Sequence, residues 1–158
     1  MSPKSLQQQV RLIPLLPAES VETRVDSGQI RQVLLNLMLN ALDSLSEGGV
    51  IEVELCPLAP GKEGAEPSSS EVTEHDAMRM LHHFASRWFL IRIADNGPGF
   101  PPDLLPRAFE PFLSTKETGT GLGLSICQRI IEAHKGTIEV ANRPTGGAEF
   151  TIRLPYVE

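Results

Sequence analysis

Apolar and polar residues alternate along several stretches of the chain, and this pattern predicts a sheet. Ile51, Val53 and Leu55 alternate with two glutamates, which is the period of two that a strand with one buried face shows. Two later stretches alternate in the same way and are joined by the turn sequence RPTGG, so they are predicted to form a closing hairpin. The predicted strands are 10–13, 21–25, 50–55, 88–94, 137–142 and 149–154, the first two being short edge strands that Pro14 and Pro17 separate.

A different spacing of apolar residues predicts two long helices. The first is capped by Asp26 or Ser27, runs to about Glu47 and is stopped by two glycines. The second begins near residue 123, presents Ile126, Ile130 and Ala133 as its apolar face, and continues to residue 134. A third, shorter helix is predicted within residues 74–86.

The first helix carries a narrow polar stripe on an otherwise apolar surface. We expect a helix this apolar to be buried on most sides, so that the amides of Asn36 and Asn40 face something polar. An unsatisfied buried amide costs about 1–3 kcal/mol, and a cavity that holds a hydrated cation and phosphates would satisfy both. A solvated outer face is the alternative, above all for the two ends of the stripe. The stripe consists of Gln29, Gln32, Asn36, Asn40, Asp43 and Glu47.

These elements predict the fold class. Hairpin-linked strands with a few helices on one side make an α+β, two-layer sandwich, here a mixed sheet covered by about three helices. The 158 residues suit a single domain, 1–158. Residues 57–86 begin with a run rich in proline, glycine and serine, and are predicted to be a flexible insert.

Composition excludes several classes of function. The net charge of −6 disfavours binding to nucleic acid or to an anionic membrane, and no segment is apolar enough to span a bilayer. Cys56 and Cys127 form no metal-ligand motif, which favours a reducing compartment. His75, His82 and His83 in the insert lack a fourth ligand at a suitable spacing, so solvated histidines are favoured over a metal site.

Residues 95–126 hold the strongest chemical signal. Asp95 follows a buried strand, where its carboxylate can accept a hydrogen bond from an exocyclic amine. Gly97 and Gly99 let the backbone approach a flat ring closely. Alternating glycines then precede the second helix, whose N-terminal amides and dipole attract phosphate. Each half alone is compatible with an ordinary turn, and neither the dinucleotide fingerprint nor a P-loop is present.

Four short sequences in a fixed order carry a family resemblance: QVLLNLMLNA, DNGPGF, FEPF and GTGLGLSI. With them, residues 26–155 without the insert resemble the ATP-binding catalytic domain of sensor histidine kinases, in the GHKL superfamily. The resemblance implies the Bergerat ATP-binding fold with ATP and Mg²⁺ as cofactors. It also implies transfer of the γ-phosphate to a histidine on a separate dimerisation and phosphoacceptor domain in two-component signalling.

The same resemblance assigns roles to single residues. Asn40 looks like the magnesium-binding asparagine, with Asn36 one turn earlier beside the phosphates. Asp95 resembles the acid that binds the adenine amino group. Lys116, in a lid at 114–118, and Arg107 are the candidates to neutralise charge on the γ-phosphate. The candidate nucleotide-binding residues are Asn36, Asn40, Asp43, Asp95, Gly97, Gly99, Lys116, Gly119, Thr120, Gly121, Leu122, Gly123 and Leu124.

The sequence departs from the family at three places. The insert is longer than the usual strand connection. Ala148 stands where relatives often carry a small hydroxyl that helps a water to bind adenine. No phosphoacceptor hairpin is recognisable, since His75-Asp76 begins like the family motif but lacks the proline that should follow. Phe109 and Phe112 of FEPF are expected to be core residues that anchor the lid.

The resemblance further implies partners and a location. They are a histidine-containing dimerisation domain of the same or a parent kinase and, indirectly, a response regulator. The chain by itself is expected to be monomeric and cytoplasmic, although a parent kinase could be anchored in a membrane.

Three alternatives stay open beside the histidine kinase. An ATP hydrolase of the same superfamily carries a glutamate, as general base, four residues before the magnesium asparagine. Here that position is Asn36, which cannot take a proton at neutral pH. A serine kinase of the anti-sigma type and an ATP-binding module without catalysis are the other two.

Overall fold

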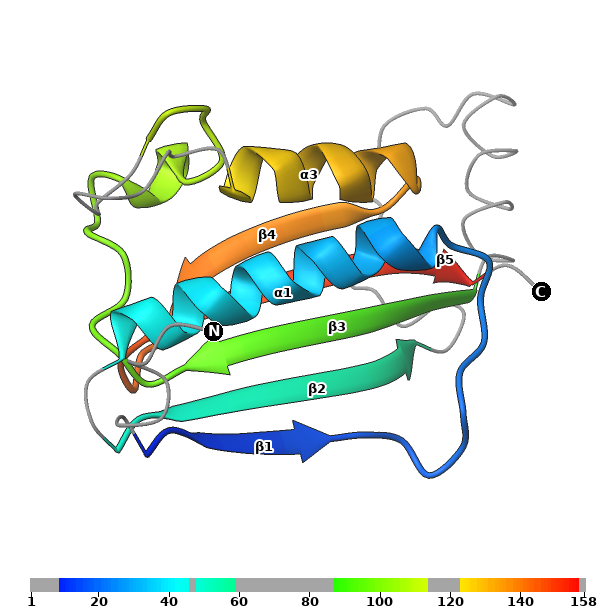
Figure 1. Ribbon diagram of the computed structural model, residues 1–158, viewed down its shortest axis with the longest axis horizontal. Helices are drawn as coiled ribbons and strands as arrows, with labels where there is room; N and C mark the ends of the chain where they lie inside the picture. The colour runs from blue at the N-terminus through cyan, green and yellow to red at the C-terminus, as the bar shows by residue number, and fades with distance from the viewer. Residues whose placement is uncertain (1–8, 46–47, 59–86, 114–122, 157–158) are drawn as a thin grey trace, which may run out of the picture.

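The computed structural model describes residues 9–45, 48–58, 87–113 and 123–156 (Figure 1). These residues form one five-stranded sheet in the order β1-β2-β3-β5-β4. The strands are β1 (Arg11–Leu15), β2 (Val50–Leu58), β3 (Arg87–Asp95), β4 (Thr137–Asn142) and β5 (Ala148–Tyr156). The helices in this part of the chain are α1 (Ser27–Ser44), α3 (Gly123–Ala133) and the short 3₁₀ turn η2 (Leu105–Arg107). None of these helices is long and apolar enough to cross a membrane.

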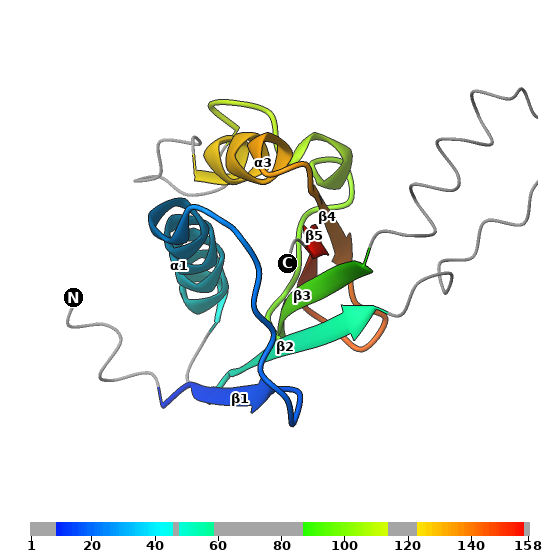
Figure 2. The same cartoon turned by 90° about the vertical axis from the view of Figure 1, so that its right-hand side faces the viewer.

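The sheet is mixed, and the predicted α+β sandwich is confirmed. β1 pairs with β2 in parallel, and α1 makes the connection between them. All other neighbouring strands are antiparallel, including the predicted hairpin of β4 and β5. Figure 2 shows α1 and α3 side by side on one face of the sheet, which gives two layers.

Asp26 starts α1 as predicted. It is the N-cap residue, and its Oδ1 accepts a hydrogen bond from Gln29 N at 3.0 Å. Asp26 N in turn donates to Nε2 of His134, whose Nδ1 lies 2.8 Å from the carbonyl oxygen of Ile130 near the end of α3. One imidazole therefore links the start of α1 to the end of α3. The helix ends at Ser44, three residues before the predicted Glu47.

The core lies between the helices and the sheet. Val33, Leu37 and Ala41 of α1 recur at helical spacing and are buried, as are Cys127 and Ile131 of α3. Each fully buried aliphatic side chain of this kind contributes roughly 1.5–3 kcal/mol relative to an exposed one. The fully buried residues of α3 are not the three that were predicted to form its apolar face, because Ile126 and Ile130 are half-buried and Ala133 is exposed. The sheet contributes the buried residues Ile51, Phe89, Ile91, Ile93, Ile138, Phe150, Ile152 and Leu154.

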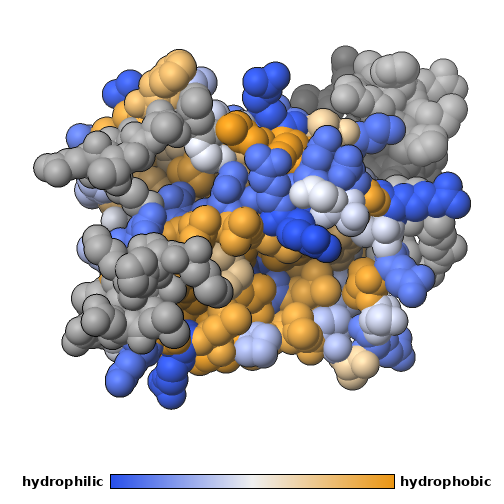
Figure 3. Space-filling model, viewed as in Figure 1, coloured by the Kyte–Doolittle hydropathy of each residue, from blue (hydrophilic) through white to orange (hydrophobic). Residues whose placement is uncertain are grey.

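The outer surface of α1 is exposed, contrary to expectation. Leu35 and Leu39 are 56% and 48% exposed, because the sheet below and α3 beside it cover only part of the helix circumference. Figure 3 shows apolar side chains gathered on this face of the molecule. The other exposed large aliphatic residues among those described lie in and just after β1, and are Leu12, Ile13, Leu15 and Leu16.

Two predicted strand boundaries change. β1 runs through Pro14, which an edge strand tolerates because it needs no ladder hydrogen bond on its outer side. Residues 21–25 form no strand, so that prediction was wrong. β2 continues to Leu58, two residues into the predicted insert, because Pro57 and Leu58 pair with Phe89 and Trp88. The remainder of the insert, with its histidines and predicted helix, lies outside the described residues.

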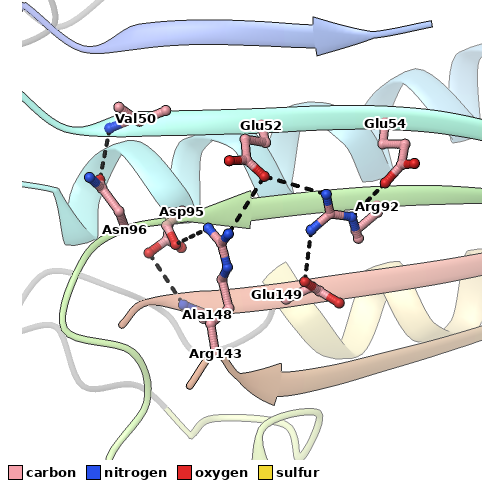
Figure 4. Close-up of polar contacts among 9 residues, drawn as sticks. All are labelled: Val50, Glu52, Glu54, Arg92, Asp95, Asn96, Arg143, Ala148 and Glu149. Atoms are coloured by element: carbon pink, nitrogen blue, oxygen red, sulfur yellow. Dashed lines mark hydrogen bonds and ion pairs between the residues drawn. The ribbon is translucent and has the colours of Figure 1, made fainter. Parts of the chain in front are cut away.

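Charged side chains cover the sheet face opposite the helices (Figure 4). Arg92 of β3 donates to Glu54 at 2.7 Å, to Glu149 at 2.9 Å and to Glu52 at 3.3 Å. The bonds to Glu54 and Glu149, the one to Glu54 first, raise the pKa of Arg92 above its ordinary value. The polar side chains of the alternating strands therefore form ion pairs with one another across β2, β3 and β5.

Candidate nucleotide-binding site

Asp95 is the last residue of β3 and is only 4% exposed. Its Oδ1 accepts hydrogen bonds from Gly97 N at 2.9 Å and from Ala148 N at 3.3 Å. Both bonds go to the same oxygen, so no described residue donates to Oδ2. A buried carboxylate prefers to have its acceptors occupied, and Oδ2 has the capacity to accept one more hydrogen from an amine.

The glycines after Asp95 are required by the protein itself. Gly99 has a φ of +76°, and a Cβ there would lie 2.7 Å from Oδ1 of Asn142. A Cβ on Gly97 would lie 3.1 Å from the carbonyl oxygen of Ser44 at the end of α1. The turn is therefore packed against β4 on one side and α1 on the other.

This packing brings the polar stripe of α1 towards Asp95. Asn40 lies one helical turn before Ser44, which contacts the turn, and both Asn36 and Asn40 are half-buried. Asn36 faces α3, because its side chain lies close enough to the Cys127 thiol to influence its pKa. Asp43, at the outer side of the stripe, is exposed.

The Cys127 thiol is fully buried where α1 meets α3. Its Sγ lies 3.8 Å from the carbonyl oxygen of Val33. Burial raises the pKa of Cys127, and the contact with Asn36 offsets only part of that rise. A thiol of this kind packs as a small apolar residue rather than reacting as a nucleophile.

We expect the two cysteines to differ in reactivity. In the native protein iodoacetamide should alkylate the half-buried Cys56 well before Cys127, because alkylation requires both access and the thiolate. Mass spectrometry of timed samples would measure both rates, with the protein in denaturant as the control in which the rates converge. Equal rates in the native protein would contradict the packing of Cys127 against α1.

The first turn of α3 lies at the same end of the molecule as the ends of α1 and β3 (Figure 1). Gly123 is the first residue of the helix and is exposed, while Leu124 packs against the core. The predicted phosphate-binding residues 119–122 and Lys116 lie outside the described residues. The part of the glycine sequence that is described therefore opens a helix, as predicted.

The stretch before the lid holds the second candidate cation. Arg107 is exposed, and its Nε and Nη2 donate to Oε2 of Glu110 at 3.0 and 2.9 Å. Its pKa is raised by Glu110, whose own pKa is lowered in return. Phe109 packs edge-on against Phe150, with ring centroids 6.4 Å apart, as expected for a core residue. Phe112 is 79% exposed and has a φ of +64°, so its expected place in the core was wrong.

The described residues contain no cluster of three or more histidine, cysteine or acidic side chains that could hold a metal ion. Magnesium does not require such a cluster, since it keeps several waters and is bound through one or two protein oxygens together with substrate phosphates. The amide oxygen of Asn40, at the end of α1 near the Asp95 turn, is a donor of that kind. The residues present therefore fit magnesium bound together with a phosphate ligand.

The β4–β5 hairpin makes contacts with the Asp95 turn that the sequence did not predict. Arg143 Nη1 donates to the backbone oxygen of Asp95 at 3.2 Å, and Ala148 N donates to its carboxylate (Figure 4). Asn142 binds both backbone polar groups of Phe100, accepting from its N and donating to its O, each at 2.8 Å. No local pattern indicates contacts that reach 42 and 48 residues along the chain.

Comparison with known proteins agrees with this geometry. Residues 25–158 match the family model described as histidine kinase-, DNA gyrase B- and HSP90-like ATPase. The sensory histidine kinase/phosphatase NtrB of Escherichia coli O157:H7 is 39% identical over 151 residues, which are 95% of this chain and 38% of NtrB.

Two solved structures of histidine kinases share the fold, and each is just under 30% identical in sequence to this chain. The catalytic domain of histidine kinase ThkA has a TM-score of 0.69 at 28% identity, over 97% of this chain and 83% of that one. Full-length ShkA in complex with AMPPNP has a TM-score of 0.69 at 27% identity, over 99% of this chain and 28% of that one.

The chain belongs to the histidine kinase-, gyrase B- and HSP90-like ATPase family, and is an ATP-binding catalytic domain of the sensor histidine kinase type. It spans between 18% and 38% of the length of the curated relatives that it matches.

Proposed function

We propose that this domain binds Mg-ATP and donates the γ-phosphate to a histidine on a separate dimerisation and phosphoacceptor domain. The observation that carries the proposal is the buried carboxylate of Asp95, with one oxygen bonded to the protein and the other without a donor among the described residues. It lies at the end of the molecule where α1 and α3 bring the other candidate residues. Family membership and the AMPPNP complex of ShkA support ATP as the ligand.

In this proposal Asp95 recognises the base. Its Oδ2 accepts a hydrogen bond from the exocyclic amine of adenine, while Oδ1 keeps the bonds to Gly97 N and Ala148 N. Because Oδ1 is fixed by two backbone donors, the carboxylate is already oriented before a nucleotide arrives, which lowers the ordering cost of binding. Gly97 and Gly99 form the floor beneath the base.

The polar stripe of α1 and the start of α3 bind the triphosphate. Asn40 supplies an amide oxygen to magnesium, Asn36 lies beside the phosphates, and Asp43 is placed at the outer edge of the same stripe. Magnesium would neutralise phosphate charge when it is bound. The amides of residues 119–124 donate to phosphate oxygens at the helix N-terminus.

Lys116 and Arg107 act on the γ-phosphate during transfer. Arg107 must exchange its bond with the exposed Glu110 for one with phosphate. The exchange is feasible because both side chains are solvated, at 55% and 51% exposure. The acceptor is a histidine domain of the same or a parent kinase, and a response regulator receives the phosphate afterwards.

Transfer is tested with radiolabelled ATP, first with the chain alone and then with a histidine-hairpin domain from its cognate kinase. We expect slow phosphate release by the chain alone, because Asn36 offers no carboxylate to activate water and a missing general base costs about 10²–10⁴-fold in rate. We expect no self-labelling, because no acceptor histidine is recognisable in the sequence. Addition of the acceptor should give acid-labile label on that domain. Lys116→Ala or Arg107→Ala should slow this step more than binding.

Two outcomes would contradict the proposal. Rapid phosphate release by the chain alone would favour a hydrolase, and acid-stable phosphoserine on a partner would favour a serine kinase. An acceptor domain whose histidine is replaced by glutamine serves as the control for non-specific labelling.

A further inference from the structure

We propose that the β4–β5 hairpin is a clamp that sets the base selectivity of the domain, with Asn142 as its main positioning residue. The inference rests on the proposed function, because it assigns the hairpin a role in adenine recognition by Asp95. The clamp consists of Asn142, Arg143, Gly147 and Ala148.

The clamp holds both ends of the turn that runs from Asp95 to Phe100. At the Asp95 end, Ala148 N binds the carboxylate and Arg143 binds the backbone oxygen. At the Phe100 end, Asn142 binds the backbone N and O together, each at 2.8 Å. The two glycines proposed to lie beneath the base therefore lie between two residues, Asp95 and Phe100, that the hairpin holds in place.

Asn142 acts as a substitute for a neighbouring strand. Its amide accepts from and donates to the same residue, as a paired strand would, although 98–104 form no regular structure. Asparagine is suited to this task because it carries a donor and an acceptor side by side. Oδ1 of Asn142 also occupies the space that a Cβ on Gly99 would need, 2.7 Å away.

The ring of Phe100 fixes the same end of the turn a second time. It packs edge-on against Phe150 of β5, with centroids 6.1 Å apart at 73°. The backbone and the side chain of Phe100 are therefore both held by the hairpin. Movement of the hairpin must carry the turn with it.

Arg143 is itself positioned by the charged face of the sheet. Its Nη2 lies 3.6 Å from Oε2 of Glu52, the oxygen that Arg92 also contacts at 3.3 Å (Figure 4). Glu52 belongs to β2 and Arg92 to β3, so these two strands and the hairpin together determine where the backbone oxygen of Asp95 lies. Arg143 therefore fixes the backbone of Asp95, the residue whose carboxylate is proposed to bind the base.

Base selectivity distinguishes a positioning role from a purely structural one. We would measure the dissociation constants of Mg-ATP and of Mg-inosine triphosphate, which has an oxo group in place of the adenine amine. Wild-type protein should prefer ATP. In Asn142→Ala the preference for ATP should fall by roughly tenfold. A loosened turn weakens the contact between Asp95 and the adenine amine, which ATP has and inosine triphosphate lacks, so only ATP should lose affinity. Glu139→Ala on the same strand removes the surface ion pair with Arg153 and should leave the preference unchanged.

Hydrogen exchange tests the geometry without any nucleotide. The amide of Phe100 should be protected in wild type and should exchange faster in Asn142→Ala, since the acceptor is gone. Asn142→Asp keeps an acceptor for this amide but loses the donor to Phe100 O. It should therefore retain protection and show an intermediate selectivity, which provides a readout if the alanine variant does not fold.

The outcomes separate this inference from the proposed function. An Asn142→Ala protein, or an Asn142→Asp protein where the former is unfolded, with wild-type selectivity would overturn the clamp. A wild-type protein that does not distinguish the two nucleotides would instead overturn the role of Asp95.

Discussion

Asp95→Asn should weaken ATP binding by roughly 10- to 150-fold, which is the loss expected for a hydrogen bond to a charged acceptor. The substitution isolates one oxygen. An asparagine can keep its Oδ1 as the acceptor for Gly97 N and Ala148 N. Its amide nitrogen then stands where Oδ2 was, and two donors face each other across the contact with adenine.

The same reversal predicts a change in selectivity. Because the new amide can donate to an oxo group, the preference for ATP over inosine triphosphate should shrink or invert in Asp95→Asn. Calorimetric titration of both nucleotides with magnesium measures this directly. Asp103→Asn, an equivalent substitution at an exposed position, is the matched control and should bind both nucleotides like wild type. Unchanged ATP affinity in Asp95→Asn would remove the adenine assignment.

Local pattern determined much of the fold in advance. The N-cap at Asp26, the strand that ends in Asp95 and the hairpin of β4 and β5 each depend on residues that lie close together in the sequence. For such elements, capping, alternation and turn chemistry are all written in short windows. The candidate residues on α1 could be found for the same reason, since a polar stripe on a helix is a local property.

The errors have a common physical cause. The exposure of Leu35 and Leu39 depends on how many elements pack around α1. The apolar residues of the helix do not indicate how many elements will do so. Residues 21–25 have strand composition, but they have no pairing partner in the sheet. Phe112 has a positive φ and is 79% exposed, because no element of the described chain packs over its ring. Each outcome is decided by tertiary context and not by local preference.

The contacts of the hairpin were invisible for a related reason. The sequence predicts Asn142 only as the last residue of a strand. Its two bonds to Phe100 exist because β5 pairs with β3 and so places the hairpin beside the turn. The contact of Gly147 with Asp95 could not be predicted from the sequence either. The sequence predicted a glycine turn between the strands, but gave no reason why one of its two glycines should matter more than the other.

The structure supplies that reason, and it predicts unequal effects for two neighbouring substitutions. Gly146 and Gly147 both have positive φ, +102° and +94°, so alanine at either position should cost about 1–2 kcal/mol in backbone strain. At Gly146 the new Cβ has room, with the nearest atom 3.9 Å away. At Gly147 it would overlap the backbone oxygen of Asp95 and lie 2.6 Å from the carbonyl carbon.

Gly147→Ala should therefore destabilise the domain by a further 1–3 kcal/mol or so, the usual cost of overpacking, since backbone atoms cannot move aside cheaply. Denaturant unfolding of both variants measures the difference, with Gly146→Ala as the control for strain alone. Any Gly147→Ala protein that folds must displace Asp95, so its ATP affinity should fall while that of Gly146→Ala stays near wild type. Equal stability and equal affinity in the two variants would mean that the hairpin does not lie against Asp95.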